Sequence, residues 1–239
     1  MRVLGGNEAP DTEVIADHVA LPVHRSLARG FVRLNMISSA DGGTAIDGVS
    51  GNLGNRSDHA VFAALRANAD AVLVGLSTVV IEGYHPPNET GPQIFVVSPT
   101  PDVSGNPELF ASGRATFVVP EGAPPAPPGV PALHAGTGGR VDLGAIVAGL
   151  VDKVILLEGG PRLAGAMLGL GLVDEFFHTT SPMLIGGESA RVAHGPLADA
   201  EPWGLLHGFC DDAGYLFLRY AKTCEQPESG IKLGAPLDE

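Results

Sequence analysis

The stretch that most constrains the fold is an apolar run at residues 154–157, followed at once by Glu158, Gly159, Gly160 and Pro161. Four consecutive apolar residues predict a strand buried on both faces, as in a parallel sheet. Two glycines permit a sharp turn, and proline is favoured in the first turn of a helix. The free N–H groups at such a helix start suit a phosphate. Because open α/β sheets bind ligands at the carboxyl ends of their strands, we expect Glu158 to lie at a binding site.

Strands and helices are expected to alternate along most of the chain. We predict strands at residues 31–37, 71–74, 93–98, 115–119, 153–157, 175–180, 205–210 and 215–220, and helices at 11–16, 57–69, 141–151 and 161–170. This alternation predicts a three-layer α/β/α fold with a mostly parallel sheet. The last two strands flank Asp-Asp-Ala-Gly and predict an antiparallel hairpin. We divide the chain into an N-terminal arm (1–30), a main domain (31–221) and a frayed tail (222–239).

Charge and composition exclude several classes of partner. The formal net charge is −13, from 14 basic and 27 acidic side chains, so we expect neither nucleic acid nor a membrane surface as a partner. The N-terminus has no apolar signal segment, and no uninterrupted apolar stretch approaches the roughly 20 residues of a membrane span. The two cysteines lack the spacing of a metal site. We expect a reduced, cytoplasmic protein that holds no metal.

Two other loops place small polar residues or an acid after an expected strand. Residues 38–42 read Ser-Ser-Ala-Asp-Gly and open a glycine-rich loop that runs to residue 56, and residues 75–78 read Gly-Leu-Ser-Thr. A loop as long as the first is usually functional in a compact domain. Each segment also has a structural interpretation, because Asp41 can bond its own turn and Ser77 or Thr78 can cap a helix. Three such segments together favour one shared ligand site.

Six segments in sequence order carry a resemblance to a known family. They are residues 33–42, 65–67, 70–75 with Thr78, 158–161, 172–175 and 181–187. This series resembles the reductase domain of bacterial bifunctional riboflavin-biosynthesis proteins, the pyrimidine reductase family, over residues 31 to about 220. The resemblance implies a dihydrofolate reductase-like fold and an NADPH-dependent reduction of 5-amino-6-(5-phosphoribosylamino)uracil or a related pyrimidine, with hydride transfer to C1′. It also implies a homodimer formed through edge strands, and the apolar strand at 215–220 is expected to need such cover.

The resemblance assigns site residues by position. The cofactor-binding residues that it implies are Ser38, Asn52, Gly75, Thr78, Glu82, Ser98, Gly159, Gly160, Pro161, Arg162, Leu163 and Ala164, with Ser98 near the 2′-phosphate. The substrate-binding residues are Asn35, Ser50 and Arg66, whose guanidinium suits a phosphate. We expect Glu158 to be catalytic, as proton donor or by holding the polar edge of the substrate, with Asp41 as the second candidate acid. The alternative for Glu158 is structural, because it can accept loop N–H bonds.

Three differences from the bifunctional family keep other functions open. The family usually has lysine in place of Asn35 and aspartate in place of Glu82. No His-x-Glu motif with a later Pro-Cys-x-x-Cys is present, so we expect no zinc deaminase chemistry. A second reading is therefore a reductase of the same fold that acts on dihydrofolate or another pterin-like compound. A third is an NADPH-binding sensor or scaffold without turnover.

Overall fold

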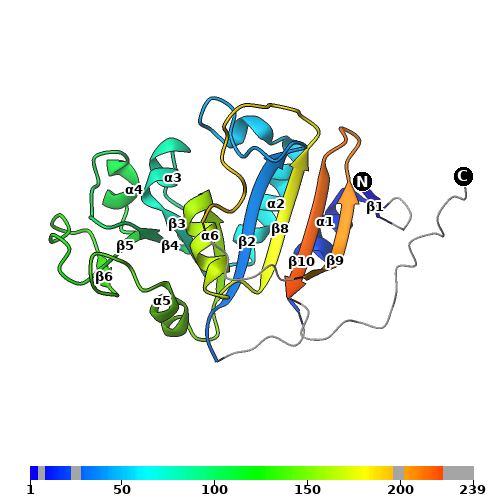
Figure 1. The fold of residues 1–239 in the computed structure, drawn as a ribbon. Helices are drawn as coiled ribbons and strands as arrows, with labels where there is room; N and C mark the ends of the chain where they lie inside the picture. The colour runs from blue at the N-terminus through cyan, green and yellow to red at the C-terminus, as the bar shows by residue number, and fades with distance from the viewer. Residues whose placement is uncertain (5–8, 23–27, 196–201, 223–239) are drawn as a thin grey trace, which may run out of the picture.

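One ten-stranded sheet runs through the part of the chain that the structure describes, residues 1–4, 9–22, 28–195 and 202–222 (Figure 1). The structure is a computed structural model. Its strands are β1 (Arg2–Val3), β2 (Phe31–Ser39), β3 (Ala71–Gly75), β4 (Gln93–Val97), β5 (Ala115–Val119), β6 (Ala132–His134), β7 (Val154–Gly159), β8 (Glu175–Ser181), β9 (Trp203–Cys210) and β10 (Leu216–Lys222). Its helices are α1 (Asp11–Val19), the short 3-10 helix η1 (Gly51–Leu53), α2 (Arg56–Ala67), α3 (Leu76–Ile81), α4 (Pro107–Ala111), α5 (Leu143–Gly149) and α6 (Pro161–Gly169).

The sheet is parallel in its main part and antiparallel at one end, as predicted. The strand order is β1-β9-β10-β8-β2-β7-β3-β4-β5-β6. All pairings from β8 through β2 to β6 are parallel, whereas β10 pairs antiparallel with both β8 and β9, and β1 pairs antiparallel with β9. We expected the apolar strand at residues 215–220 to lie at the edge of the sheet. This prediction is wrong, because β10 lies inside the sheet, with β9 and then β1 beyond it.

Two hydrophobic clusters, one on each face of the sheet, make the three layers. Helices α1, α2, α3 and α4 contribute to one cluster, which includes Leu65, Phe110 and Phe217. Helices α5 and α6 contribute to the other, which includes Ile146 and Met167. Figure 1 shows α5 and α6 in front of the sheet and α1 and α2 behind it. Alternate side chains of one strand enter opposite clusters, as the period of two in a strand requires. Among the described residues, no helix is long and apolar enough to cross a membrane.

Several local boundaries differ from the prediction. The second helix begins at Arg56 rather than at residue 57, because Asn55 caps it by accepting a hydrogen bond from Asp58 N at 2.9 Å. The prediction that Ser77 or Thr78 caps the next helix is wrong, since α3 starts at Leu76 with Gly75 as its N-cap. The elements α4, β6 and β1 were not predicted. They have five, three and two residues, too short for a periodic pattern.

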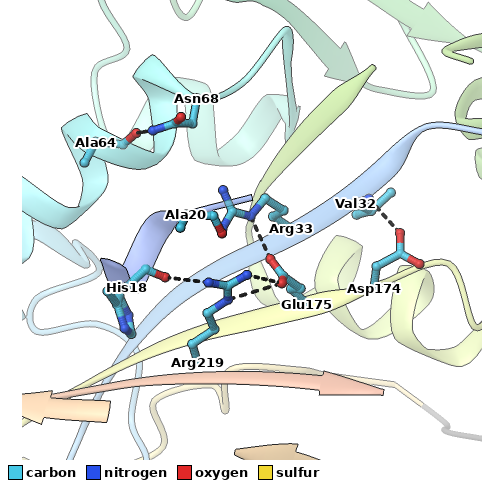
Figure 2. A network of polar contacts seen from close by, with 9 residues as sticks. All are labelled: His18, Ala20, Val32, Arg33, Ala64, Asn68, Asp174, Glu175 and Arg219. Atoms are coloured by element: carbon cyan, nitrogen blue, oxygen red, sulfur yellow. Dashed lines mark hydrogen bonds and ion pairs between the residues drawn. The ribbon is translucent and has the colours of Figure 1, made fainter. Parts of the chain in front are cut away.

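The N-terminal helix is fastened to the sheet by a buried charged network (Figure 2). Glu175 lies between two guanidinium groups: Arg33 Nε donates to its Oε2 at 2.8 Å, and Arg219 pairs with its Oε1. Both arginines also reach the end of α1, because Arg219 Nη1 donates to the His18 carbonyl at 3.1 Å and Arg33 Nη2 to the Ala20 carbonyl at 3.3 Å. The expected N-terminal arm thus includes a helix packed on the sheet. The expected frayed tail lies outside the described residues, apart from residue 222.

Candidate active site

A cleft of about 1840 Å³ opens at the carboxyl ends of the central strands. Its walls come from the end of β2, the loop before α2, one face of α2, the start of α3, the loop after β4, the start of α6 and residues 185–194. Because β2, β7, β3 and β4 are neighbours and parallel, their carboxyl ends meet at one edge of the sheet. The segments at residues 75–78 and 158–161 therefore come together at this cleft, whereas residues 38–42, which we expected to share the site, lie outside its lining.

Glu158 is the centre of a cluster of side chains in this cleft. It is buried at the end of β7, and its two carboxylate oxygens accept hydrogen bonds from Arg66 Nε and Nη2, each at 2.7 Å. Tyr84 donates its hydroxyl to Glu158 Oε2. Arg66 also stacks on two rings, 4.5 Å from the centroid of Phe62 and 5.1 Å from that of Tyr84. The partners of Glu158 are thus side chains that line the cleft, and not the loop N–H groups that the structural alternative proposed.

Tyr84 keeps its proton in this cluster. Burial, followed by the charge of Glu158, raises the pKa of the Tyr84 hydroxyl well above its usual value. A neutral phenol donates one hydrogen bond, and here the acceptor is Glu158. The position of Glu158 is consequently fixed from two sides, by a bidentate cation and by a neutral donor.

The two-glycine turn brings α3 and α6 together. Gly159 has φ of +79°, a conformation that favours glycine, and a Cβ there would lie 2.8 Å from Met36 Sδ. Gly160 N donates to Thr78 Oγ1 at 2.7 Å, which ties the start of α6 to α3. Gly160 is the N-cap of α6, Pro161 is in its first turn, and no side chain of the described residues caps this helix. Residues 160–163 line the cleft, so the uncapped start of α6 lies at its wall.

Several residues assigned to the cofactor bind other parts of the protein. Glu82 Oε1 accepts a hydrogen bond from Ser50 N at 2.8 Å, so these two residues join α3 to the long loop. Ser98 is buried and donates its hydroxyl to the Thr100 carbonyl at 2.6 Å. Ser38 is buried and contacts His178 Nε2 at 2.9 Å, and Asn52 is exposed and donates to the Ile46 carbonyl.

Asp41 holds a loop in place. It accepts hydrogen bonds from Ser39 Oγ at 2.5 Å, Gly186 N at 2.7 Å and Ile185 N at 3.2 Å. The hydrogen bond from Ser39, followed by those from Gly186 and Ile185, lowers the pKa of Asp41 from 3.8 to about 2. A carboxyl with so low a pKa is ionised at neutral pH and has no proton to give. Asp41 thus accepts hydrogen bonds within the loop and lies outside the lining of the cleft, and its catalytic role stays a prediction.

The assigned residues divide into two groups by their position at the cleft. Those that line it are Asn35, Ser50, Arg66, Gly75, Thr78, Glu82, Ser98, Glu158, Gly160, Pro161, Arg162 and Leu163. Those outside its lining are Ser38, Asp41, Asn52, Gly159 and Ala164. Ala164 is fully buried on the core side of α6, and Gly159 is part of the turn before that helix, with φ of +79°. These five residues lie next to the cleft in the sequence, but their side chains do not line it, and Gly159 has none.

Sequence reasoning missed three side chains of the cleft. Tyr84 completes the Glu158 cluster, and Phe62 forms its aromatic wall. Asp58 lines the cleft at the start of α2, where burial raises the pKa of its carboxyl. The signal for two of them was present: Asp58, Phe62 and Arg66 are spaced four residues apart, so they share one face of a helix.

Comparisons with known proteins give a match to one family and several similar proteins. The model of the RibD C-terminal domain family matches residues 30–207. The 2,5-diamino-6-ribosylamino-4(3H)-pyrimidinone 5′-phosphate reductase of Methanothermobacter thermautotrophicus is 29% identical over 179 residues, which are 68% of this chain and 82% of that protein. A pyrimidine reductase-like protein of Corynebacterium diphtheriae has a similar structure, with a TM-score of 0.71, 23% identity, and coverage of 90% of this chain and 99% of that one.

A dihydrofolate reductase gives a more distant comparison that identifies the fold. The Enterococcus faecalis enzyme, described in complex with NADP(H), superposes with a TM-score of 0.52 at 14% identity and covers 80% of this chain and 96% of that one. Together with the mostly parallel sheet and its antiparallel end, this likeness confirms the expected dihydrofolate reductase-like fold. The matched region contains the Glu158 cluster, the glycine turn and the whole of α2. This chain belongs to the RibD C-terminal domain family.

Proposed function

We propose that the protein is an NADPH-dependent reductase of a ribosylaminopyrimidine 5′-phosphate, the reaction type of riboflavin biosynthesis. The observation that carries the proposal is the Glu158–Arg66–Tyr84 cluster, which lies in the cleft of a chain of this family. The relative from Methanothermobacter thermautotrophicus is named as such a reductase. Family membership favours this activity over reduction of dihydrofolate and over a sensor without turnover.

The residues present fit NADPH. The first turn of α6 is uncapped by side chains and suits a pyrophosphate, and Arg140 and Arg162 line the same cleft and supply positive charge in an acidic protein. A Cβ at Gly160 would lie only 2.9 Å from Thr78 Oγ1, so the close approach of the two chain segments at this point requires glycine. The cleft exceeds the roughly 300–1,000 Å³ of a typical single-ligand site, which leaves room for a cofactor and a substrate.

When bound, NADPH supplies the hydride that adds to C1′ of the opened ribosyl group, and a proton completes the reduction to the ribityl chain. The protein residues orient the substrate for this step. Glu158 fixes Arg66 through both of its oxygens, and the two rings beside it restrict the guanidinium further. A guanidinium held in this way presents its remaining N–H groups to an anionic or carbonyl group of the substrate with little loss of entropy. Glu158 remains our candidate for holding the substrate and for proton transfer.

The test is a reductase assay with purified protein. We would incubate the protein with NADPH and, separately, with the diaminopyrimidinone phosphate, the corresponding uracil phosphate and dihydrofolate, and follow the nicotinamide absorbance. Oxidation with a ribosylaminopyrimidine phosphate but not with dihydrofolate supports the proposal. Tight NADPH binding without oxidation in any mixture would overturn it in favour of a sensor. Because Ser98, Thr100 and Arg140 all line the cleft, we propose NADPH over NADH, and equal dissociation constants for the two would contradict this choice.

We also propose that the protein forms a homodimer through β9. In the described part of the chain, β1 covers the outer edge of β9 only near residues 208–210, and Leu205 and Leu206 on this strand are exposed by 42% and 56%. An exposed apolar edge strand favours pairing with another chain. Light scattering should give twice the mass of one chain, and Leu206→Lys should lower it to that of a monomer. A monomeric mass for the unaltered protein would end this proposal.

A further inference from the structure

Asp58 is an acid of the cleft that the assigned site does not use. It lies in the first turn of α2 and lines the cleft together with Phe62 and Arg66, one and two steps of four residues further along the helix. No ion pair to Asp58 occurs within the described residues; its side chain hydrogen-bonds to Thr179, and the charge of His59 acts on it more weakly. An ionised carboxylate accepts about four hydrogen bonds, so most of its capacity is still available.

The surroundings of Asp58 make a bound N–H donor favourable. Burial is the largest influence on this carboxyl and raises its pKa, which means that the anion is poorly solvated where it stands. The turn at Gly54 packs against this carboxylate, because a Cβ there would lie 2.8 Å from Asp58 Oδ2. A ligand with two adjacent N–H groups would replace the missing water with two charge-assisted hydrogen bonds.

The two ends of this face of α2 have opposite charges. Asp58 and Arg66 are eight residues apart, about 12 Å along the helix axis at a rise of 1.5 Å per residue. Phe62 lies between them along the helix and lines the cleft, with the Arg66 guanidinium stacked on its ring. A ribosylaminopyrimidine phosphate has the matching order of groups: a base edge with N–H donors, a flat ring and sugar, and an anionic phosphate.

We infer that Asp58 selects the pyrimidine base and favours a 2-amino over a 2-oxo substrate. This inference rests on the proposed function and specifies its substrate. The 2-amino group and the neighbouring N3–H of a diaminopyrimidinone are two parallel donors, which a carboxylate accepts together. In the corresponding uracil, the 2-amino group is replaced by a carbonyl, whose lone pairs would face the negative charge of Asp58. A site of this kind rejects the mismatched base by repulsion as well as by a lost hydrogen bond.

The test compares two substrates in three proteins. We would measure kcat/KM with NADPH for the 2,5-diaminopyrimidinone ribosylamino phosphate and for its uracil counterpart, using the unaltered protein, Asp58→Asn, and Asp152→Asn as the matched control. Asp152 is an exposed acid with φ of +61° at the other end of β7, a conformation that asparagine tolerates. The ratio of the two values within one preparation is independent of how much of the protein is folded.

We expect the unaltered protein and Asp152→Asn to prefer the diamino compound by about 100-fold or more. Asp58→Asn should reduce or reverse that ratio by a similar factor, because an amide can donate to the 2-oxo group and accept from N3–H. A ratio near one in the unaltered protein, or a ratio that Asp58→Asn leaves unchanged, would overturn this inference while the reductase function stands. Failure of the unaltered protein to oxidise NADPH with either compound would refute the proposed function itself, and with it the role of Asp58.

Discussion

Replacing Glu175 by glutamine should strongly destabilise the fold. Glu175 is the acid between Arg33 and Arg219, and all three side chains are buried, with exposures of 2%, 1% and 8%. Glutamine has nearly the same size, so the substitution changes the charge and leaves the packing intact. The two guanidinium groups would then face a neutral amide, and their own bonds to the carbonyl groups of His18 and Ala20 would have to hold α1 alone (Figure 2).

The expected magnitude follows from the burial of the pair. Removing one partner of a buried ion pair costs about 3–5 kcal/mol, because the remaining charge keeps its desolvation penalty. With a typical urea dependence of about 1–3 kcal/mol per molar, a loss of about 4 kcal/mol lowers the unfolding midpoint by about 2 M. Such a loss is a large part of the roughly 5–15 kcal/mol that stabilises a domain.

The assay is equilibrium unfolding in urea, with Asp70→Asn as the control. Asp70 pairs with Lys153 at 3.3 Å, but these side chains are exposed by 41% and 53%, and asparagine can still accept the hydrogen bond from Val154 N. Solvent screening limits such a pair to about 0–1 kcal/mol. If both substitutions lower the free energy of unfolding by the same amount, or if Glu175→Gln costs less than about 1 kcal/mol, burial is not what makes the Glu175 network important.

Three further outcomes are expected. Burial, and then the neighbouring His207, lowers the pKa of His18 from 6.5 to about 3. Because the unfolded chain binds this proton at a higher pH than the folded one, the free energy of unfolding should be at its full value above about pH 6.5 and fall toward pH 3 by at most about 1.4 kcal/mol per pH unit. His18→Asn should reduce this slope in unfolding titrations. Gly160→Val should weaken NADPH binding at least tenfold, about 1.4 kcal/mol, in a dissociation-constant measurement, and unchanged affinity in a folded variant would exclude the α6 start as the pyrophosphate site. Glu158→Gln should lower turnover about a hundredfold with NADPH affinity intact; normal turnover with a lower melting temperature would make Glu158 a scaffold residue.

The sequence predicts the parts of the fold that local pattern determines. The run at residues 115–119 is a strand with those bounds, and Gly171, with φ of +66°, follows the C-cap of α6 one residue after the predicted end of that helix. The carboxyl ends of the strands also place most of the cleft correctly. Short elements such as α4 give no periodic signal, and their position depends on caps like Asn106. The edge of the sheet was misplaced because the order of strands depends on contacts across the whole chain.

Within the site, the errors come from partners that are distant in sequence. Asp41 is an acid after a strand, as a catalytic residue would be, but its carboxylate accepts hydrogen bonds from Ile185 and Gly186, more than 140 positions away. Tyr84 gave no signal, because its role depends on Glu158, which is 74 positions further along the chain. A pattern can therefore locate the site, whereas the direction in which each side chain points is decided by tertiary contacts.

The fastening of the N-terminal helix has a consequence for how the protein is made. The carbonyl of His18 is held by Arg219, 201 positions later, and Arg2 in β1 pairs with Cys210 in β9. During synthesis, residues 1–20 therefore cannot form these native contacts until β9 and β10 have been synthesised. Contacts so far apart in sequence slow folding, because a long loop must close before they form. We expect the central parallel strands to assemble first, and α1 and β1 to pack against β9 and β10 in the last step of folding.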